Sequence, residues 1–460
     1  MLNLYVLFVR VFIACSIVVH SLNAFSNFAT KTSYDSIHNP DDLGVEDEFN
    51  SVDVNKLTCQ AAHASALIRH GTRFPGQNDV HEISEIHKVM KDHLDELKFE
   101  TLTKWTNHFP NNNEKTLMDM GEDEQFHLGR RMAHRLKSLF VDENIDDDFR
   151  FSVSSKQRSQ DSARAFFEGF TEVLTGEASD DIDPELSDET LRFHERCHKF
   201  IITVDRNETA LHEYKKFKQS KLIQNILSKI VSKYALPPDV LSAGNIRTMY
   251  IICAYEMALF KKSPWCDMFD EEDAKVIEYL SDLKHYYKNG YGYDIIREQS
   301  CPLVADMFGI MDDAISALEE PLEDSDEDTA AYTLGNFYFG HAETIGPLYA
   351  ALGLFNDSEP LRADNYDKHH NRLFRTSNII PFSANLMFVL YECEPQISDT
   401  EDDTAEYMLK LFVNEKVQKI PGCDGDICPY EYVRKRYEKY IDDCNFRKTC
   451  AVGYKVKDEL

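Results

Sequence analysis

The sequence predicts an α/β fold in which helices flank a central, mostly parallel sheet and an all-α insertion interrupts the chain. Apolar runs of strand length at 64–68, 149–153 and 334–339 each lead into a helical pattern, an alternation typical of parallel sheets. Between the second and third runs, residues 176–329 show helical periodicity only. The length of 460 residues also suits a large domain with an insertion better than one simple core.

Two amphipathic helices are expected between the first two strands. Apolar residues recur at three- and four-residue steps from Ile83 to Leu97, and again from Phe126 to Phe140. Arg130 and Arg131 fall within the second helix, and the pattern favours a solvent-exposed position for both.

The insertion, from 176 to 329, contains five helical patterns separated by Pro and Gly residues, and its acidic end at 319–328 is expected to be an exposed loop. The five patterns are Glu185–Ile201, Lys221–Tyr234, Asn245–Phe260, Glu272–Tyr287 and Leu303–Leu318. Further strands are expected at Leu386–Tyr391 and Leu409–Val413, and a last helix at Tyr432–Tyr440. We therefore assign 58–175 and 330–415 to the α/β core and 416–456 to a C-terminal segment of helix and disulfides.

Both ends of the chain carry sorting signals. The first 24 residues match a secretory signal peptide, because the apolar core at 11–19 is short and follows Arg10. Residues 25–57 are polar and acidic without periodicity, so we expect a flexible leader. The last four residues, 457–460, read Lys-Asp-Glu-Leu, the address that a retention receptor recognises in the endoplasmic reticulum. The sequence thus predicts a lumenal protein without a membrane span.

The cysteines agree with that compartment. Ten remain after Cys15 leaves with the signal peptide, and an even number in an oxidising lumen indicates disulfides. Short spacing suggests the local pairs Cys423–Cys428, Cys444–Cys450 and Cys253–Cys266. Cys59, just before the first strand, could pair with Cys393, just after a later apolar strand, and the sequence alone leaves on the order of a thousand pairings open. A zinc site near Cys423 is disfavoured because no His follows at ligand spacing. Asn207 and Asn356 begin glycosylation acceptor triplets.

The overall charge excludes one class of partner. With 80 acidic and 50 basic residues the net charge is −30. A nucleic-acid partner would require a basic face, so this balance argues against one. A polyanionic substrate would need a local group of cations within an otherwise acidic protein.

The strongest functional signal is the segment 69–75, which reads Arg-His-Gly-Thr-Arg-Phe-Pro and directly follows the first apolar strand. Arg69 and Arg73 flank His70, and guanidinium groups present paired donors that match phosphate oxygens. A neutral imidazole nitrogen can attack phosphorus and form a covalent intermediate. Gly71 lets the backbone approach an anion closely. A basic loop with a structural histidine is the simpler alternative, but five fixed positions after a buried strand argue against it.

This segment resembles the signature of the histidine acid phosphatases. The resemblance implies a histidine phosphatase fold, phosphorylation of His70, and binding of the phosphoryl group by Arg69 and Arg73. It also implies a reaction without a metal or other cofactor, because arginines neutralise the phosphate charge.

A third arginine, Arg158, follows the strand at 149–153 and precedes a helix, a junction where α/β sheets place ligands. A surface salt bridge with Asp161 explains Arg158 equally well from the residues alone. The segment 154–166 resembles the block that supplies a further phosphate-binding arginine in the same family, which favours a place in the site. Lys156 is a further candidate for contact with substrate.

His341 and Glu343 follow the strand at 334–339. Phosphoryl transfer leaves an alkoxide that needs a proton to depart, and a carboxylic acid beside an imidazole could deliver it. The residues alone also fit a capped helix start with Pro347 in its first turn. Most histidine acid phosphatases carry His-Asp at this point, whereas the multiple inositol-polyphosphate phosphatases are similar to this chain in carrying His-Ala-Glu-Thr.

The resemblance to that subtype covers about 55–415, including the block 375–393, and the C-terminal tetrapeptide also resembles theirs. It implies hydrolysis of inositol hexakisphosphate (phytate) and its lower esters through a phosphohistidine, with 2,3-bisphosphoglycerate as a further substrate. His341 would assist, Glu343 would be the acid, and the cations that select the substrate are expected from the insertion. Two alternatives stay open: a broad-specificity lumenal acid phosphatase, and an inactive phosphate-binding lumenal protein that retains the fold.

Overall fold

A computed structural model describes residues 27–54, 57–109, 114–140, 149–319, 332–395 and 405–452. The expected signal peptide and retention tail, and nearly all of the acidic loop at 319–328, lie outside these residues. The described strands form a nine-stranded mixed sheet with the order β4-β3-β5-β2-β6-β7-β8, in which β1 pairs with β2 and β9 with β7. Their bounds are β1 Ser51–Val54, β2 Leu57–Arg69, β3 Phe149–Val153, β4 Glu185–Leu186, β5 Gly335–Gly340, β6 Asn385–Pro395, β7 Glu406–Val413, β8 Lys416–Val417 and β9 Ile427–Pro429.

Parallel pairing in the middle of the sheet brings three strand ends together. Strands β4, β3, β5 and β2 run parallel, whereas β6 is antiparallel to β2 and β7 is antiparallel to β6. Residues 64–69 of β2 pair with 335–340 of β5, which also pairs with 149–153 of β3. The carboxyl ends of β2, β3 and β5 therefore meet at one edge of the sheet. The predicted α/β class is confirmed. The antiparallel strands β6, β7, β8 and β9 lie beyond β2 on one side of this parallel group, and β1 pairs antiparallel with the start of β2.

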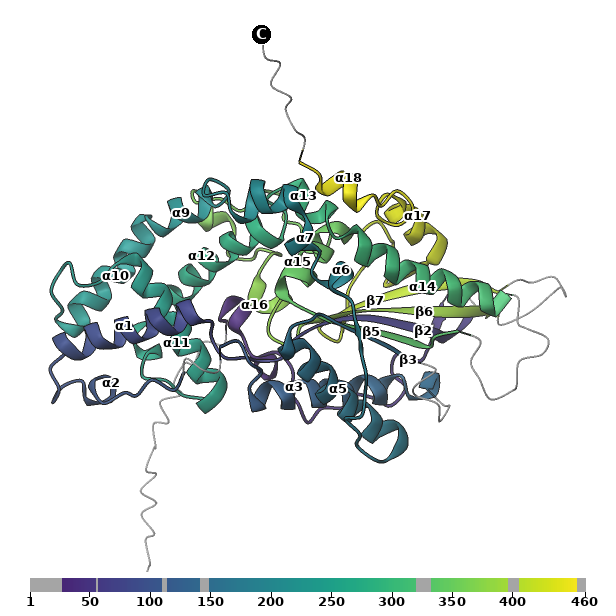
Figure 1. The fold of residues 1–460 in the computed structure, drawn as a ribbon, viewed down its shortest axis with the longest axis horizontal. Coiled ribbons are helices and arrows are strands. Elements are labelled where there is room, and N and C mark those ends of the chain that lie inside the picture. Colours follow the sequence, from purple (N-terminus) through teal and green to yellow (C-terminus); the bar gives the residue numbers. More distant parts are fainter. Residues whose placement is uncertain are drawn as a thin grey trace, which may run out of the picture.

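Strand β2 is buried on both faces because helices cover the sheet from both sides (Figure 1). Ala64, Ala66 and Ile68 belong to a core that they share with α3 (Asp119–Arg135) and α5 (Gln157–Thr175). Leu67, whose side chain alternates to the opposite face, belongs to a second core with α14 (Cys301–Glu319) and α15 (Ala342–Leu352). A strand buried on both faces reads as a continuous apolar run, which is the pattern seen in this part of the sequence.

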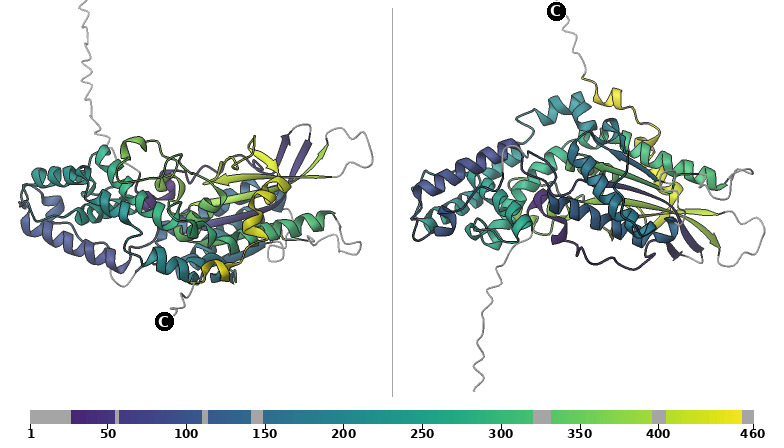
Figure 2. Two further views of the ribbon diagram at one scale, coloured as in Figure 1. Left: turned by 90° about the horizontal axis from the view of Figure 1, so that it is seen from above. Right: turned by 60° about the horizontal axis from the view of Figure 1, so that its bottom comes forward.

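A helical cap lies at the end of the molecule away from the sheet, as the views in Figures 1 and 2 agree. It contains α9 (His212–Lys218), α10 (Lys221–Tyr234), α11 (Ala243–Phe260) and α12 (Glu271–Asn289) from the insertion. Helix α1 (Gln77–His93), from the core segment, packs on α11, with α2 (Glu100–Thr103) beside it. Conversely, α14 packs on β2 and α17 (Tyr430–Ile441), so the insertion ends within the core. No helix in the described ranges is long and apolar enough to cross a membrane.

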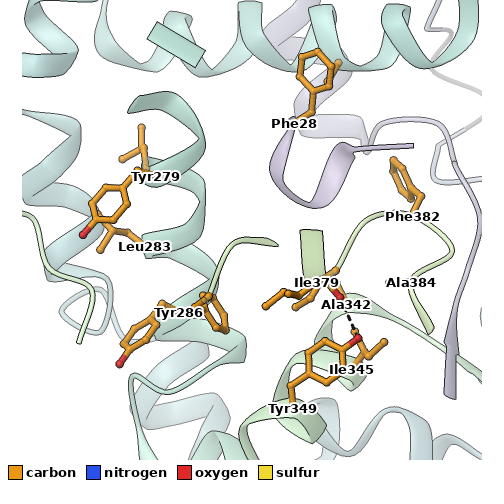
Figure 3. Close-up of a cluster of buried hydrophobic side chains, with 14 of the residues drawn as sticks. Phe28, Tyr279, Leu283, Tyr286, Ala342, Ile345, Tyr349, Ile379, Phe382 and Ala384 are labelled. Atoms are coloured by element: carbon orange, nitrogen blue, oxygen red, sulfur yellow. Dashed lines mark hydrogen bonds between the residues drawn. The ribbon is translucent and has the colours of Figure 1, made fainter. Parts of the chain in front are cut away.

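The cap and the sheet share one apolar core. Tyr279, Leu283 and Tyr286 of α12 belong to the same buried cluster as Ala342, Ile345 and Tyr349 of α15. Figure 3 shows several of these side chains, with the Tyr349 hydroxyl donating to the carbonyl of Ile379 at 3.0 Å. Continuous burial across the two regions fixes the cap on the core.

The expected flexible leader at 25–57 is wrong for the described residues 27–54. They form two short 3-10 turns, η1 (Ala29–Lys31) and η2 (Tyr34–Ser36), and the strand β1, which pairs antiparallel with β2. Phe28, Tyr34 and Phe49 are buried in the cores. Three-residue turns and irregularly spaced aromatic residues leave no periodic signal, so only tertiary contacts reveal their burial.

The expected helix Glu185–Ile201 is also wrong. The segment is broken into β4, α6 (Asp188–Leu191), α7 (Phe193–Arg196) and α8 (His198–Phe200), and the π-turn η5 (Ile201–Asp205) follows. Its turns are held by buried Leu191, Phe193 and Cys197 rather than by one continuous apolar stripe. The other four helical patterns of the insertion correspond to α10, α11, α12 and α14 within one or two residues at each end. The short helices α13 (Asp294–Glu298), α16 (Thr376–Ile379) and α18 (Phe446–Cys450) have no counterpart in the prediction.

Five disulfides are present among the described residues. Cys59–Cys393, Cys253–Cys266 and Cys423–Cys428 pair as predicted. The expected Cys444–Cys450 pair is wrong, because the actual bonds are Cys301–Cys444 and Cys197–Cys450. The C-terminal helices α17 and α18 are thereby joined to α14 and to the base of the insertion, contacts that local spacing does not reveal.

The expected solvent exposure of Arg131 is wrong as well. The guanidinium of Arg131 is 1% exposed and donates three hydrogen bonds, of 2.8 to 3.1 Å, to the carboxylate of Glu415. Arg130 is partly buried and lies 2.7 Å from Glu172. The partner of Arg131 is 284 residues away in the sequence, so the helical pattern alone could not indicate that an ion pair buries this charge.

Candidate active site

All six sequence-predicted site residues line one pocket of about 880 Å³ at the sheet edge where β2, β3 and β5 end. They are Arg69, His70, Arg73, Arg158, His341 and Glu343. Lys156 lines the same pocket. Residues of α11 and α12 form its opposite wall, so the pocket lies between the sheet and the cap.

The segment 69–73, here called the catalytic loop, is fixed through its backbone. Each of its first four N–H groups has an acceptor at 2.8 to 3.1 Å; the acceptors are Ala384 O, Gly340 O, Ser162 Oγ and Glu124 Oε2. A Cβ on Gly71 would lie 2.2 Å from the carbonyl oxygen of Gly121, so only glycine allows this approach of α3. The loop is therefore held rigidly from the sheet, from α5 and from α3.

The geometry of His70 defines its tautomer. Its Nδ1 lies 2.8 Å from the carbonyl oxygen of Gly71, which can only accept, so Nδ1 carries the proton. The lone pair then resides on Nε2. Burial, followed by the charges of Arg158 and Arg69, lowers the pKa of His70 well below its usual value. The imidazole is consequently neutral and has a nucleophilic nitrogen.

Three guanidinium groups in this pocket have donors without acceptors. The Nε atoms of Arg69, Arg73 and Arg158 are buried, and none has a hydrogen-bond partner among the described residues. Burial, and then the charge of Arg73, lowers the pKa of Arg69 to about 9 and that of Arg158 to about 10. Buried donors without acceptors are unfavourable, and so is the mutual repulsion of these cations. An anion with several oxygens relieves both.

Arg158 is held by His341 rather than by Asp161. Its Nη2 donates to Nδ1 of His341 at 3.1 Å, and Nε2 of His341 lies 2.9 Å from the hydroxyl of Ser154. That hydroxyl donates to Ser159, so Nε2 of His341 is the protonated nitrogen. The His341 ring lies 5.5 Å from the His70 ring, centroid to centroid. Among the contacts of the described residues, Asp161 is paired with Arg164 at 3.6 Å, and the alternative salt bridge to Arg158 is absent.

Glu343 differs from the other carboxylates of the pocket. Asp79, Glu114, Glu195 and Asp205 form salt bridges with Arg247, Lys115, Arg192 and Lys288, respectively. Glu343 has no such bridge within the part of the chain that the structure describes. Its side chain reaches the solvent of the pocket from the first turn of α15, where His341 is the N-cap residue. Desolvation within the pocket by itself would raise the pKa of Glu343. The imidazoles of His194 and His341, a backbone hydrogen bond and the charge of Arg69 outweigh this effect, so the pKa is lowered.

The pocket is cationic in an acidic protein. Ten Lys and Arg side chains line it against five Asp and Glu side chains, although the whole chain carries −30. Several of these cations were not predicted, among them Lys284 and Lys288 of α12, Arg247 of α11 and Lys31 of η1. A signal existed for the pair on α12, because they continue the helical face of Ile277 and Leu280 toward the pocket. For Lys31 there was none, because it follows no motif.

Comparison with known proteins now has a geometric basis. A profile described as histidine phosphatase superfamily, branch 2, matches residues 62–414, which include the catalytic loop and both later segments of the site. The chain belongs to this superfamily. The same range contains most of β2, the strands β3 to β7 and the whole cap.

Relatives within the histidine phosphatase superfamily match over nearly the full length. Multiple inositol polyphosphate phosphatase 1 of Gallus gallus is 32% identical over 458 residues, covering 96% of this chain and 97% of the relative. The protein of the same name from Homo sapiens is 33% identical, with 96% and 92% covered. A solved structure of the multiple inositol polyphosphate phosphatase of Bifidobacterium longum, in complex with inositol hexasulfate, superposes with a TM-score of 0.70. At 15% identity over 90% of this chain and 97% of that one, it shows the likeness of fold.

Proposed function

We propose that this histidine phosphatase hydrolyses inositol polyphosphates, namely inositol hexakisphosphate and its lower esters, through a phosphohistidine at His70. The observation that carries the proposal is that three arginines, each with a buried Nε that lacks an acceptor, line one pocket together with an imidazole whose Nε2 bears a lone pair. Such a site binds a tetrahedral oxyanion and presents a nucleophile to its central atom.

In the first step Nε2 of His70 attacks the phosphorus and the ester P–O bond breaks. Arg69, Arg73 and Arg158 neutralise the charge on the three equatorial oxygens, which is the main source of catalysis in phosphoryl transfer. The inositol oxygen leaves with a proton from Glu343. In the second step water attacks the phosphorus, Glu343 accepts the proton of that water, and the P–N bond breaks to regenerate neutral His70.

We propose that Glu343 acquires its proton as the substrate binds. The cationic field that lowers its pKa is partly cancelled when a phosphate with negative charge enters, so the pKa rises in the complex. A carboxylate without a lysine or arginine bridge can undergo this change without breaking a salt bridge. The role of His341 follows from its contacts, because its Nδ1 accepts from Nη2 of Arg158 and so holds that guanidinium group in the pocket.

The preference for polyphosphorylated substrates is supported by charge and size. The transferring phosphoryl group occupies three arginines, and seven further cations line a pocket of about 880 Å³, the size range of small-molecule sites. The names of the relatives point in the same direction. A bisphosphate such as 2,3-bisphosphoglycerate meets the same charge requirement with fewer contacts. A broad-specificity acid phosphatase would have no use for the additional cations.

We further propose that the protein works in the lumen of the endoplasmic reticulum, retained through 457–460 and glycosylated at Asn207 and Asn356. Its support is the N-terminal apolar segment, the ten cysteines in five disulfides, and the exposed position of Asn356. Deleting 457–460 should release the glycosylated chain into the medium of expressing cells. Equal secretion of the full-length chain would refute retention by this tail.

The deciding experiment measures phosphate release from inositol hexakisphosphate in EDTA, with product isomers resolved. We expect full activity in EDTA and none in His70→Ala, which should still unfold at the wild-type temperature. Acid-quenched wild-type enzyme given labelled substrate should carry an acid-labile, alkali-stable phosphate, as expected for phosphohistidine. Label on an aspartate or serine would disprove the mechanism, and absence of any phosphatase activity would favour the inactive phosphate-binding protein.

A further inference from the structure

Residues 27–34, here called the N-terminal strap, connect the cap and the core beside the pocket. On the cap side the hydroxyl of Tyr250 donates to the carbonyl of Asn27, and the hydroxyl of Thr30 lies 3.3 Å from Nε2 of His285. On the core side the carbonyl of Thr32 accepts from the N–H of Phe382 at 2.9 Å, and the N–H of Tyr34 donates to Glu124 at 2.9 Å. Phe28 at its start and Phe382 beside it both belong to the buried cluster in Figure 3. The strap is thus fixed at both ends.

The strap positions one of the phosphate-binding arginines. Nη1 of Arg69 donates to the carbonyl oxygens of Thr30 and Ile380, each at 2.9 Å, and the guanidinium carbon lies 4.5 Å from the ring centroid of Phe382. Two carbonyls on one nitrogen fix the plane of the guanidinium. Nε of Arg69 stays buried without an acceptor.

Lys31 is the strap residue whose charge faces the pocket. Its Nζ lies 5.6 Å from the ring centroid of Phe382 and 5.9 Å from that of Tyr255. Lys115 and Lys288 of the same pocket have carboxylate partners, at 3.3 and 2.6 Å, but none of the described residues places a carboxylate within salt-bridge distance of Lys31. Burial, and then the charges of Arg73 and Arg69, lowers the pKa of Lys31 well below its usual value.

An ammonium group set deep among other cations is unfavourable in the folded protein unless an anion joins it. The three oxygens of the transferring phosphoryl group are already matched by three guanidinium groups. The anion that Lys31 lacks must therefore be a different group of the same ligand.

We propose that the N-terminal strap is part of the active site, and that Lys31 binds a second phosphate of the substrate while Arg69, Arg73 and Arg158 bind the phosphate under attack. The inference rests on the proposed function, because it requires a substrate with more than one phosphate. It also adds a source of specificity, because the sequence led us to expect these cations from the insertion and from Lys156. Lys31 is a specificity-determining residue, and the carbonyl of Thr30 is a positioning group.

The test compares two substrates in one variant. Lys31→Met keeps the aliphatic stem and removes the charge. On inositol hexakisphosphate we expect kcat/KM to fall about 10- to 100-fold, mainly through KM, because one charge-assisted contact is lost. On nitrophenyl phosphate, which has no second phosphate, kcat and KM should change less than about threefold. Lys31→Arg keeps a positive charge and should therefore retain most of the wild-type kcat/KM on inositol hexakisphosphate. As a control, Lys98→Met removes an exposed lysine outside the pocket and should change kcat and KM on neither substrate.

The outcomes separate this inference from the proposed function. Equal losses of Lys31→Met on both substrates would overturn the inference, since Lys31 would then serve the phosphoryl group under attack or the fold of the strap. Unchanged kcat and KM of Lys31→Met on both substrates would overturn the inference as well. Wild-type enzyme that cleaves nitrophenyl phosphate but not inositol hexakisphosphate would refute the proposed substrate itself. Unchanged thermal unfolding together with retained nitrophenyl phosphatase activity shows that the variant is folded.

Discussion

Substitution of Glu343 by Gln tests the chemistry of the site most directly. The change keeps size and hydrogen bonding but removes the proton that the leaving group needs. Four of the five carboxylates lining the pocket are tied into salt bridges, so no second acid is available to replace Glu343 within the described residues. We therefore expect the full value of general acid catalysis to be lost on inositol hexakisphosphate. That loss is about 10²–10⁴-fold in the phosphorylation rate, or about 2.7–5.5 kcal/mol of transition-state stabilisation.

The leaving group provides the control. A nitrophenolate departs without protonation, whereas an inositol alkoxide does not. Rapid-quench measurement of the first turnover should therefore show nearly wild-type phosphorylation of His70 by nitrophenyl phosphate in Glu343→Gln. Release of phosphate should then be slow, because the same carboxylate activates water in the second step, and nitrophenol should appear in a burst.

The pH dependence gives an independent check. The acid must be protonated in the complex, and the surrounding cations hold its pKa low. Wild-type phosphorylation by inositol hexakisphosphate should thus decline toward the rate of Glu343→Gln as the pH rises, and the ratio of the two rates should be largest in acid. The assignment would be refuted if Glu343→Gln lowered the phosphorylation rate equally with both substrates, or if the ratio of the two rates did not depend on pH. Glu343 would then have a positioning role only.

Three further predictions concern other charged groups of the protein. Arg158→Ala should lower kcat/KM about 10- to 150-fold, because a charge-assisted contact contributes about 1.5–3 kcal/mol; an unchanged rate would exclude Arg158 from the site. Burial raises the pKa of Glu124 to about 7, so its proton stabilises the folded state fully below about pH 4.5, and this contribution is lost as the pH rises through 7. Denaturant unfolding should show wild type losing about 3 kcal/mol relative to Glu124→Gln between pH 4.5 and 7.5, and parallel curves would contradict the shifted pKa. Glu415→Gln leaves Arg131 buried without its carboxylate and should lower the free energy of unfolding by about 3–5 kcal/mol in the same assay. The control Glu189→Gln, at an exposed salt bridge, should leave it unchanged. An unchanged free energy of unfolding in Glu415→Gln would show that the buried pair adds nothing to stability.

Local patterns predicted those parts of the site that follow strands. The catalytic loop, Arg158 and the pair His341 and Glu343 each come directly after an apolar run, and parallel pairing places the ends of such runs at one edge. The sheet and the longer helices were predictable for the same reason, since burial on one or two faces imposes a period on the sequence.

The rest depends on contacts between distant segments. Lys31 enters the pocket through a strap of short turns that has no periodicity. Arg131 is buried because Glu415 neutralises it, and Cys450 pairs with Cys197 instead of its neighbour in the sequence. A propensity or spacing rule uses only one segment of the chain at a time. None of these three contacts could therefore be predicted from the sequence alone.

The position of β2 in the sheet has a consequence for biosynthesis. It lies near the start of the chain, yet the two strands that pair with its apolar residues come much later in the sequence. Strand β5 follows more than 260 residues later, and β6 more than 310 residues later. The N–H groups of Arg69 and His70 find their acceptors at Ala384 and Gly340. While the ribosome makes the cap, the apolar residues of β2 therefore have no partner strand, and slow, non-local pairing of this kind is prone to aggregation. A nascent chain that stops before residue 384 contains the whole Arg-His-Gly-Thr-Arg segment and still lacks an active site.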